Sequence, residues 1–184
     1  MSEPVRIVIT GAPASGKTKF FERLRGHPSL SDFLFFEELA RRLLVEDAGY
    51  RERPADFHRE IYRRQRARED AAPRRSFITD RGTADAFAFH PETAAEVGTT
   101  PAAEYRRYTG VIQLGTAAAL GPEYYQADEV RIEPIAAVLA LERQIRSVWE
   151  RHPGYQFVPA RESVDEKYAV FVEIVCRLAG KTPV

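Results

Sequence analysis

The sequence predicts an α/β fold in which helices cover both faces of a parallel five-stranded sheet. Three observations lead to this prediction. A β-branched run over residues 5–10 is followed by a glycine-rich loop and then by helical spacing over 17–25. Further apolar runs of strand length alternate with helical patterns along the rest of the chain. Polar residues directly follow several of these runs, at the carboxyl ends where such folds place their sites.

The composition sets limits on the class of protein. A length of 184 residues, with 44% hydrophobic and 29% charged residues, is typical of one globular domain spanning 1–184. The formal net charge of zero argues against nucleic acid or a membrane surface as a partner. No apolar run approaches the roughly 18 residues of a membrane span. The chain goes directly into its first strand, leaving no room for a signal peptide, so a cytoplasmic location is expected. The sequence leaves the oligomeric state open.

The glycine-rich loop matches the full phosphate-binding pattern G-x-x-x-x-G-K-[ST]. Its glycines let successive backbone N–H groups turn toward phosphate oxygens, with the positive end of the next helix behind them. Lys17 is expected to reach the β- and γ-phosphates, and the Thr18 hydroxyl to bind Mg²⁺. The pattern therefore predicts ATP and Mg²⁺ as ligands and a three-layer P-loop NTPase fold, with strand order 2-3-1-4-5. The expected nucleotide-binding residues are Gly11, Ala12, Pro13, Ala14, Ser15, Gly16, Lys17 and Thr18.

The remaining helices, strands and loops are predicted from apolar periodicity and from the residues that begin or end such elements. Ser163, with Glu166 three residues later, forms a capping box that begins the last helix. Residues 115–131 contain glycine, proline and paired tyrosines, and predict a long, lid-like loop. The expected strands are 5–10, 33–36, 76–79, 110–114 and 155–158; the expected helices are 17–25, 39–48, 56–71, 133–151 and 163–180, with an Ala/Phe-rich stretch over 83–90.

Asp80 and Arg81 come directly after the third strand. An acid at this place in phosphate-loop proteins holds Mg²⁺ or its waters, so Asp80 is a second candidate metal residue. The guanidinium of Arg81 would form bidentate hydrogen bonds and offset charge that accumulates during phosphoryl transfer. The alternative is a structural Asp–Arg pair at the start of the next helix.

Glu37 and Glu38 follow the second strand, where one of these side chains is expected to face the phosphate loop. A carboxylate there would accept a proton from a substrate hydroxyl, as small-molecule kinases require. The alternative is a solvated residue at a helix start, which the helix dipole favours. The residues alone do not decide which of the two glutamates points at the site.

Two further features have more than one interpretation. Arg131, at the end of the long loop, is either a lid arginine that closes over phosphates or a surface residue. The arginine-rich helix over 56–71 carries interspersed acids, which favours a solvated face over an RNA-binding one. On that helix Gln65 is expected to face inward with Ile61, either contacting the edge of a base or sugar or packing in the core.

Motifs in a fixed order run along nearly the whole chain. They are Gly-Ala-Pro-x-x-Gly-Lys-Thr at 11–18, Glu-x-Ala-Arg at 38–41, Ile61–Gln65–Glu69, Asp-Arg-Gly-x-x-Asp-Ala at 80–86, Leu-Gly-Thr-Ala-Ala at 114–118, Arg-x-Glu at 131–133, Trp-Glu-Arg-His-Pro at 149–153 and Glu-Lys at 166–167. With these motifs the chain resembles AAA-like P-loop ATPase and kinase domains related to the ribosylnicotinamide kinase domain of bacterial NAD-metabolism regulators. By this resemblance Glu38 is favoured over Glu37, and Arg131 gains weight as a lid arginine.

The arrangement is also similar to the deoxynucleoside kinases, which have a glutamate after strand two, an acidic–Arg pair after strand three and an arginine lid. The chain departs from them in two ways. Asp80 stands where those enzymes often have Glu-Arg-Ser, and no aromatic pair in the sequence marks a slot for a stacked base.

These observations predict a Mg²⁺-ATP-dependent phosphotransferase that acts on a small hydroxylated or nucleoside-like molecule. In this hypothesis Lys17, Glu38, Asp80, Arg81 and Arg131 are the catalytic residues. The alternative is a nucleotide-binding ATPase- or GTPase-like regulatory module that hydrolyses slowly and uses no small-molecule acceptor. A classical GTPase is disfavoured because no Asn-Lys-x-Asp or Thr-Lys-x-Asp motif follows the fourth strand.

Overall fold

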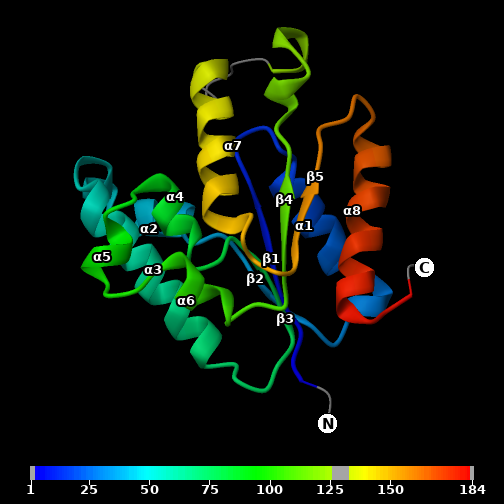
Figure 1. Cartoon of the computed structure of the whole chain (residues 1–184), viewed down its shortest axis with the longest axis horizontal. Helices are drawn as coiled ribbons and strands as arrows, with labels where there is room; N and C mark the ends of the chain where they lie inside the picture. The colour runs from blue at the N-terminus through cyan, green and yellow to red at the C-terminus, as the bar shows by residue number, and fades with distance from the viewer. Residues whose placement is uncertain (1–2, 126–132, 183–184) are drawn as a thin grey trace.

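The structure is a computed structural model that describes residues 3–125 and 133–182. Its five strands form one parallel sheet in the order β2-β3-β1-β4-β5 (Figure 1). This confirms the predicted sheet and its strand order. The strands are β1 (Arg6–Gly11), β2 (Leu34–Phe36), β3 (Phe77–Asp80), β4 (Gly110–Leu114) and β5 (Tyr155–Val158).

Helices connect the strands and lie on both sides of the sheet (Figure 1). The α-helices are α1 (Lys17–Arg25), α2 (Ala40–Glu46), α3 (Pro54–Asp70), α4 (Asp85–Phe89), α5 (Thr93–Glu96), α6 (Pro101–Tyr105), α7 (Ile135–Trp149) and α8 (Val164–Ala179). Short 3-10 helices cover Pro28–Leu30, Ala48–Glu52, Ala117–Ala119 and Pro122–Tyr124.

The alternation of side chains along β1 divides the core into two layers. Ile7 and Ile9 pack on one face of the sheet with residues of α1 and α8. Val8 points to the opposite face, where it packs with residues of α3, α4 and α7. Because successive side chains of a strand point to opposite faces, one β-branched strand supplies both cores. Burying the central strands on both faces holds their carboxyl ends, and the loops that follow them, in fixed positions.

The ends of the elements follow local signals, with shifts of one or two residues from the predicted bounds. The predicted 56–71 helix begins at Pro54, because proline at a first helical position has a suitable fixed φ and no N–H to satisfy. Helix α8 has the predicted cap: the Ser163 hydroxyl accepts a hydrogen bond from the N–H of Glu166 at 3.2 Å. The predicted 115–131 loop contains two 3-10 turns in its described part, 115–125. In the ranges that the structure covers, no helix is long and apolar enough to cross a membrane.

Candidate active site

The phosphate loop connects β1 to α1 through two residues with left-handed backbones. Gly16, the residue before α1, has φ +82°, a conformation that glycine adopts without steric cost. Ala14 has φ +59°, which is uncommon for a residue with a Cβ atom. The loop turns sharply at these residues and places Lys17 in the first turn of the nine-residue helix α1. The positive end of this helix therefore lies behind the loop.

The outer side of the phosphate loop is hydrogen-bonded to the segment after β4. The Thr116 hydroxyl donates to the carbonyl of Pro13 at 2.6 Å, and the Ala117 N–H donates to the carbonyl of Ala14 at 3.0 Å. In a trans peptide the carbonyl and the following N–H point in opposite directions. Because the carbonyls of Pro13 and Ala14 point toward the segment after β4, the N–H groups of Ala14 and Ser15 point away from it. The Ser15 N–H donates a hydrogen bond within the loop, to the carbonyl of Ala12 at 3.2 Å.

Lys167 of α8 holds the same loop from a second direction. Its buried ammonium donates to the carbonyl of Ser15 at 2.7 Å and to that of Gly115 at 2.6 Å. Burial lowers the pKa of Lys167 to about 8. No role was predicted for Lys167 from the sequence, although it stands in the Glu-Lys motif at 166–167. The one feature of the sequence that could have drawn attention to Lys167 is that lysine is rare in this chain, whose basic residues are mostly arginine.

Lys17 and Asp80 form an ion pair at the centre of the site. Asp80 is the last residue of β3, and its carboxylate accepts a hydrogen bond from the Lys17 ammonium. Both side chains are more than nine-tenths buried. Burial raises the pKa of Asp80 above its ordinary value, although the charge of Lys17 acts in the opposite direction. Lys17 and Asp80 are therefore direct charge partners of each other.

Glu38 and Arg81 form a second pair beside the first. The Arg81 Nε donates to Glu38 Oε1 at 2.6 Å, and Glu38 Oε2 lies 3.8 Å from the Lys17 Nζ. Burial raises the pKa of Glu38, but the charges of Arg81 and Lys17 outweigh this effect and bring it down to about 2. Arg81 itself has φ +70°, and its Nη2 donates to the carbonyl of Gly11 at 3.3 Å. A strained backbone conformation therefore directs this guanidinium toward the start of the phosphate loop.

Asp85, at the start of α4, has a buried carboxylate that accepts hydrogen bonds. It was not predicted from the sequence to belong to the site. It accepts hydrogen bonds from the Thr10 hydroxyl, from Arg81 Nη1 at 3.4 Å, from the Gly82 N–H at 2.8 Å and from the Trp149 Nε1 at 3.2 Å. The Asp-Arg-Gly-x-x-Asp-Ala motif contained this residue, but its spacing alone did not indicate what it contacts. Asp85 fixes the turn after β3 and one side of the Arg81 guanidinium.

The other predicted residues lie as follows. Glu37 is 71% exposed and pairs with Arg25 at 2.7 Å, away from Lys17, whereas Glu38 faces Lys17. Thr18 follows Lys17 in the first turn of α1 and is exposed. Arg131 lies outside the described residues.

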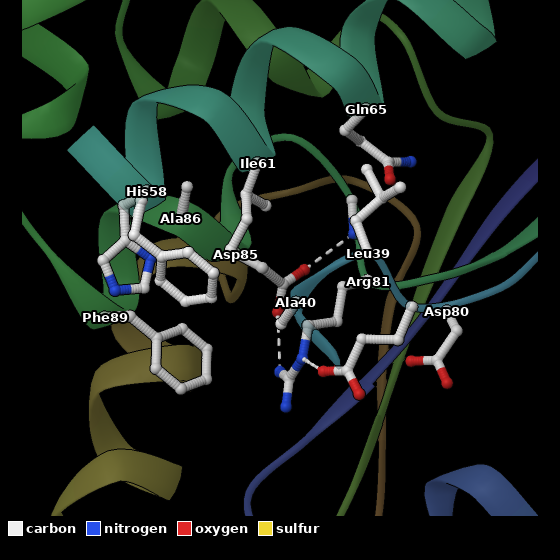
Figure 2. Close-up of a pocket in the computed structure, with 13 residues that line it drawn as sticks. Leu39, Ala40, His58, Ile61, Gln65, Asp80, Arg81, Asp85, Ala86 and Phe89 are labelled. Atoms are coloured by element: carbon white, nitrogen blue, oxygen red, sulfur yellow. Dashed lines mark hydrogen bonds and ion pairs between the residues drawn. The ribbon is translucent and has the colours of Figure 1, made fainter. Parts of the chain in front are cut away.

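Two cavities meet at Glu38 and Arg81. One, of about 540 Å³, is lined by the phosphate loop, and Glu133 lies on its wall. The other, of about 120 Å³, lies among α2, α3 and α4. Figure 2 shows His58 and Phe89 at one end of the smaller cavity, Asp80 at the other, and Arg81 between them. Glu38 and Arg81 line both cavities, so they stand between the space at the phosphate loop and an apolar one.

The donor set fits Mg²⁺. Thr18, Glu38 and Asp80 line one depression of about 240 Å³ beside the phosphate loop, and all present the oxygen atoms that this hard cation prefers. No cluster of three or more metal-ligating side chains occurs within 3–125 and 133–182. Mg²⁺ in kinase sites is bound through one or two carboxylates together with substrate phosphates and water, so such a cluster is not required.

The parallel sheet of order 2-3-1-4-5, with a phosphate loop after its first strand, defines a P-loop NTPase with a nucleoside-kinase-like fold. A family model described as an AAA domain matches residues 6–167. This match covers most of the 184 residues, and the chain belongs to this family of AAA domains.

Two solved structures of deoxyadenosine kinase from M. mycoides are similar to the chain. The first, with bound dATP, has a TM-score of 0.64 at 12% identity and covers 93% of this chain and 98% of that one. The second, described with the products dCMP and a flexible dCDP bound, has a TM-score of 0.64 at 11% identity and covers 94% and 100%. At this identity the likeness shows the fold. No curated protein matches the sequence.

Proposed function

We propose that the chain is a Mg²⁺-ATP-dependent phosphotransferase whose acceptor is a small hydroxylated, nucleoside-like molecule. The observation that carries this proposal is the position of Glu38 and Arg81 on the walls of both cavities. An acceptor hydroxyl in the smaller cavity and a γ-phosphate at the phosphate loop would meet at these two side chains. Holding two reactants in this way is the main task of a kinase site.

The residues of the phosphate loop bind and neutralise the donor in this proposal. Lys17 leaves Asp80 and pairs with the phosphates, while N–H groups of the loop and of the first turn of α1 surround them. Thr18 and Asp80 would hold Mg²⁺, which would supply positive charge beside the phosphates. Arg81 adds a second cation at the transferred group, and Arg131 is proposed as a lid residue over it.

Glu38 takes the proton of the acceptor. The hydroxyl oxygen forms a bond to the γ-phosphorus, the bond from that phosphorus to the bridging oxygen breaks, and ADP leaves. The hydroxyl proton passes to the Glu38 carboxylate. The charges of Arg81 and Lys17 hold the pKa of Glu38 at about 2. Moving Lys17 to the phosphates takes one of these charges away from Glu38, which acts to raise the pKa of its carboxyl group.

The comparisons support this assignment at the level of fold. The similar solved structures are those of a deoxyadenosine kinase, which phosphorylates a nucleoside, according to its name. The relation to ribosylnicotinamide kinases stays a prediction from the order of the motifs. The apolar cavity next to Glu38 favours a kinase over the regulatory ATPase alternative, because an ATPase without an acceptor has no use for it.

Glu38→Gln tests the proposal. The purified variant and the wild type would be incubated with ATP, Mg²⁺ and a panel of nucleosides and small hydroxylated metabolites, and products read by the mass gain of one phosphoryl group. We expect the wild type to phosphorylate a member of the panel and Glu38→Gln to do so about 10²–10⁴-fold more slowly. ATP affinity, measured by calorimetry, should change little.

Glu37→Gln is the matched control, because Glu37 is the neighbouring acid and pairs with Arg25 on the surface. It should keep wild-type transfer. ATP hydrolysis that no acceptor accelerates, with equal rates in wild type and Glu38→Gln, would contradict the kinase assignment and favour the regulatory module.

A further inference from the structure

The segment that carries Glu38 receives little support from the sheet itself. Strand β2 lies at the edge of the sheet and has three residues, and its pairing with β3 ends at Phe36, opposite Thr79. Glu37 and Glu38 follow this last pair, and helix α2 begins at Ala40. The inference below rests on the proposed function, in which Glu38 must be held at the acceptor hydroxyl. Such a role requires a contact outside the sheet that fixes the segment.

Arg68 of α3 supplies this contact. Its Nη1 donates to the carbonyl of Glu37 at 2.6 Å, and this carbonyl belongs to the peptide bond that leads into Glu38. The Cζ of the same guanidinium lies over the Phe36 ring, 5.2 Å from the ring centre. Hydrogen bonds from a charged donor are about twice as strong as those between neutral groups. Arg68 therefore contacts the segment at the last residue of β2 and again immediately before Glu38.

The other terminal nitrogen of Arg68 is anchored inside the protein. Its Nη2 donates to the amide oxygen of Gln65 and, at 3.4 Å, to the Thr79 hydroxyl. The amide nitrogen of Gln65 donates to the same hydroxyl at 2.9 Å. The Thr79 hydroxyl in turn donates to the carbonyl of Arg81 at 2.8 Å. The anchor is thus tied to the end of β3 and to the residue that pairs with Glu38.

These bonds favour the core interpretation of Gln65 over contact with a base or sugar. Gln65 is 3% exposed, and both ends of its amide have partners inside the protein. The oxygen accepts from Arg68, and the nitrogen donates to Thr79 and Glu69. A contact with a base or sugar edge would require breaking these buried hydrogen bonds. Gln65 lines the smaller cavity, but its polar atoms hold Arg68 in place.

We propose that Arg68 is a positioning residue for Glu38: its guanidinium joins the end of β2 to the end of β3 and so holds the Glu38 carboxylate toward the acceptor hydroxyl. Arginine suits this task because its planar guanidinium presents several donors in fixed directions, so one side chain contacts both segments at once. Lysine has one compact ammonium on a flexible stem. Arg68 acts through the carbonyl of Glu37.

Arg68→Met tests this role, because methionine keeps an unbranched stem and removes every donor. With the acceptor that the nucleoside and metabolite panel identifies, kcat for phosphoryl transfer should fall about 10–100-fold, because a misplacement of about 1 Å can cost about 10²-fold. The KM for ATP should stay within about twofold of the wild-type value. Arg63→Met is the matched control: Arg63 is an exposed arginine of the same helix, and its loss should leave kcat unchanged.

A double variant shows whether Arg68 acts through Glu38. In Glu38→Gln no carboxylate is left to position, so adding Arg68→Met should lower the transfer rate by less than about threefold. A structural role unrelated to Glu38 would lower the rate by the same factor in both backgrounds. Arg68→Lys keeps the positive charge and a donor without the fixed fork, and should transfer at a rate between those of the wild type and Arg68→Met.

Crystal structures of the wild type and Arg68→Met give a second readout that needs no acceptor. We expect the main chain at Glu37 and Glu38 to move by about 1 Å. The 2.6 Å hydrogen bond between Arg81 and Glu38 should lengthen or break. The phosphate loop should keep its position, because Arg68 contacts the ends of β2 and β3.

Three results overturn the inference: an unmoved Glu38 in crystals of Arg68→Met, wild-type transfer by this variant, or an equally large loss in the Glu38→Gln background. The proposed function fails separately. Wild-type transfer by Glu38→Gln would reject the proposed base and, with it, the residue that positions that base. Slow transfer by Glu38→Gln together with full activity of Arg68→Met would keep the kinase assignment and reject this inference alone.

Discussion

The ammonium of Lys17 and the carboxylate of Asp80 form an ion pair in which both side chains are almost completely buried. Each of these residues has a proposed partner in the nucleotide complex: phosphate for Lys17 and Mg²⁺ for Asp80. On this proposal, the pair would be exchanged for two new contacts when Mg²⁺-ATP binds. Because separating a buried pair leaves an uncompensated charge, Lys17 and Asp80 should be released together, and metal and nucleotide should bind cooperatively.

Asp80→Asn tests this exchange. The asparagine keeps the shape of the side chain but no longer holds Lys17 by charge. ATP binding without Mg²⁺ should be as tight as in the wild type or a few-fold tighter, whereas the enhancement of ATP binding by Mg²⁺ should be lost. Phosphoryl transfer should fall by about 10²–10³-fold. Calorimetric titration of ATP with and without Mg²⁺ measures the first two effects. Full Mg²⁺ enhancement in Asp80→Asn would show that Asp80 is not the metal-binding acid.

Lys167→Met tests the support of the phosphate loop from α8. Methionine fills similar space but leaves the carbonyls of Ser15 and Gly115 without their donor. ATP affinity should fall about tenfold, which corresponds to about 1.4 kcal/mol. Lys181→Met is the control, because Lys181 forms a surface pair with Asp32 at 3.0 Å. Equal ATP affinity in the wild type and Lys167→Met would mean that the loop keeps its shape without this lysine.

The same lysine predicts a pH dependence. Burial lowers the pKa of Lys167 to about 8, from an ordinary value of 10.5. Between these values the unfolded chain binds the proton and the folded chain does not, so this group raises the free energy of unfolding as pH rises through that window. ATP affinity should change in the opposite direction, because a positive charge beside the loop is lost above pH 8. Titrations of ATP from pH 7 to pH 9.5 should show this decline in wild type and not in Lys167→Met.

The fold could be predicted because its signals are local. The pattern from residues 11 to 18 identifies the loop, and the short apolar runs before it and along the chain identify buried parallel strands. Once the strands are parallel, their carboxyl ends lie at one edge of the sheet. This geometry is sufficient to bring Glu38 and Asp80 to the phosphate loop, although they stand 42 residues apart in the sequence.

Contacts that depend on packing between helices could not be predicted in this way. Lys167 contacts a carbonyl 152 residues away, and helical periodicity places it on the buried face of α8 without indicating its partner. The aromatic wall of the smaller cavity is a similar case. No aromatic pair stood out in the sequence, yet Phe57 of α3 and Phe89 of α4 line one cavity because the two helices pack together. Such pairs appear only when the angle and register of the helices are known.

Asp85→Asn tests the residue that holds the turn after β3. All four groups that contact the Asp85 carboxylate are donors, among them the Gly82 N–H and the Trp149 indole. The amide NH₂ of asparagine would face one of these donors, which leaves buried polar atoms unpaired. The free energy of unfolding should fall by about 1–3 kcal/mol, measured by denaturant titration. Asp32→Asn, which removes an exposed surface charge, should cost less than about 1 kcal/mol. Equal stability of the two variants would mean that Asp85 does not organise this turn.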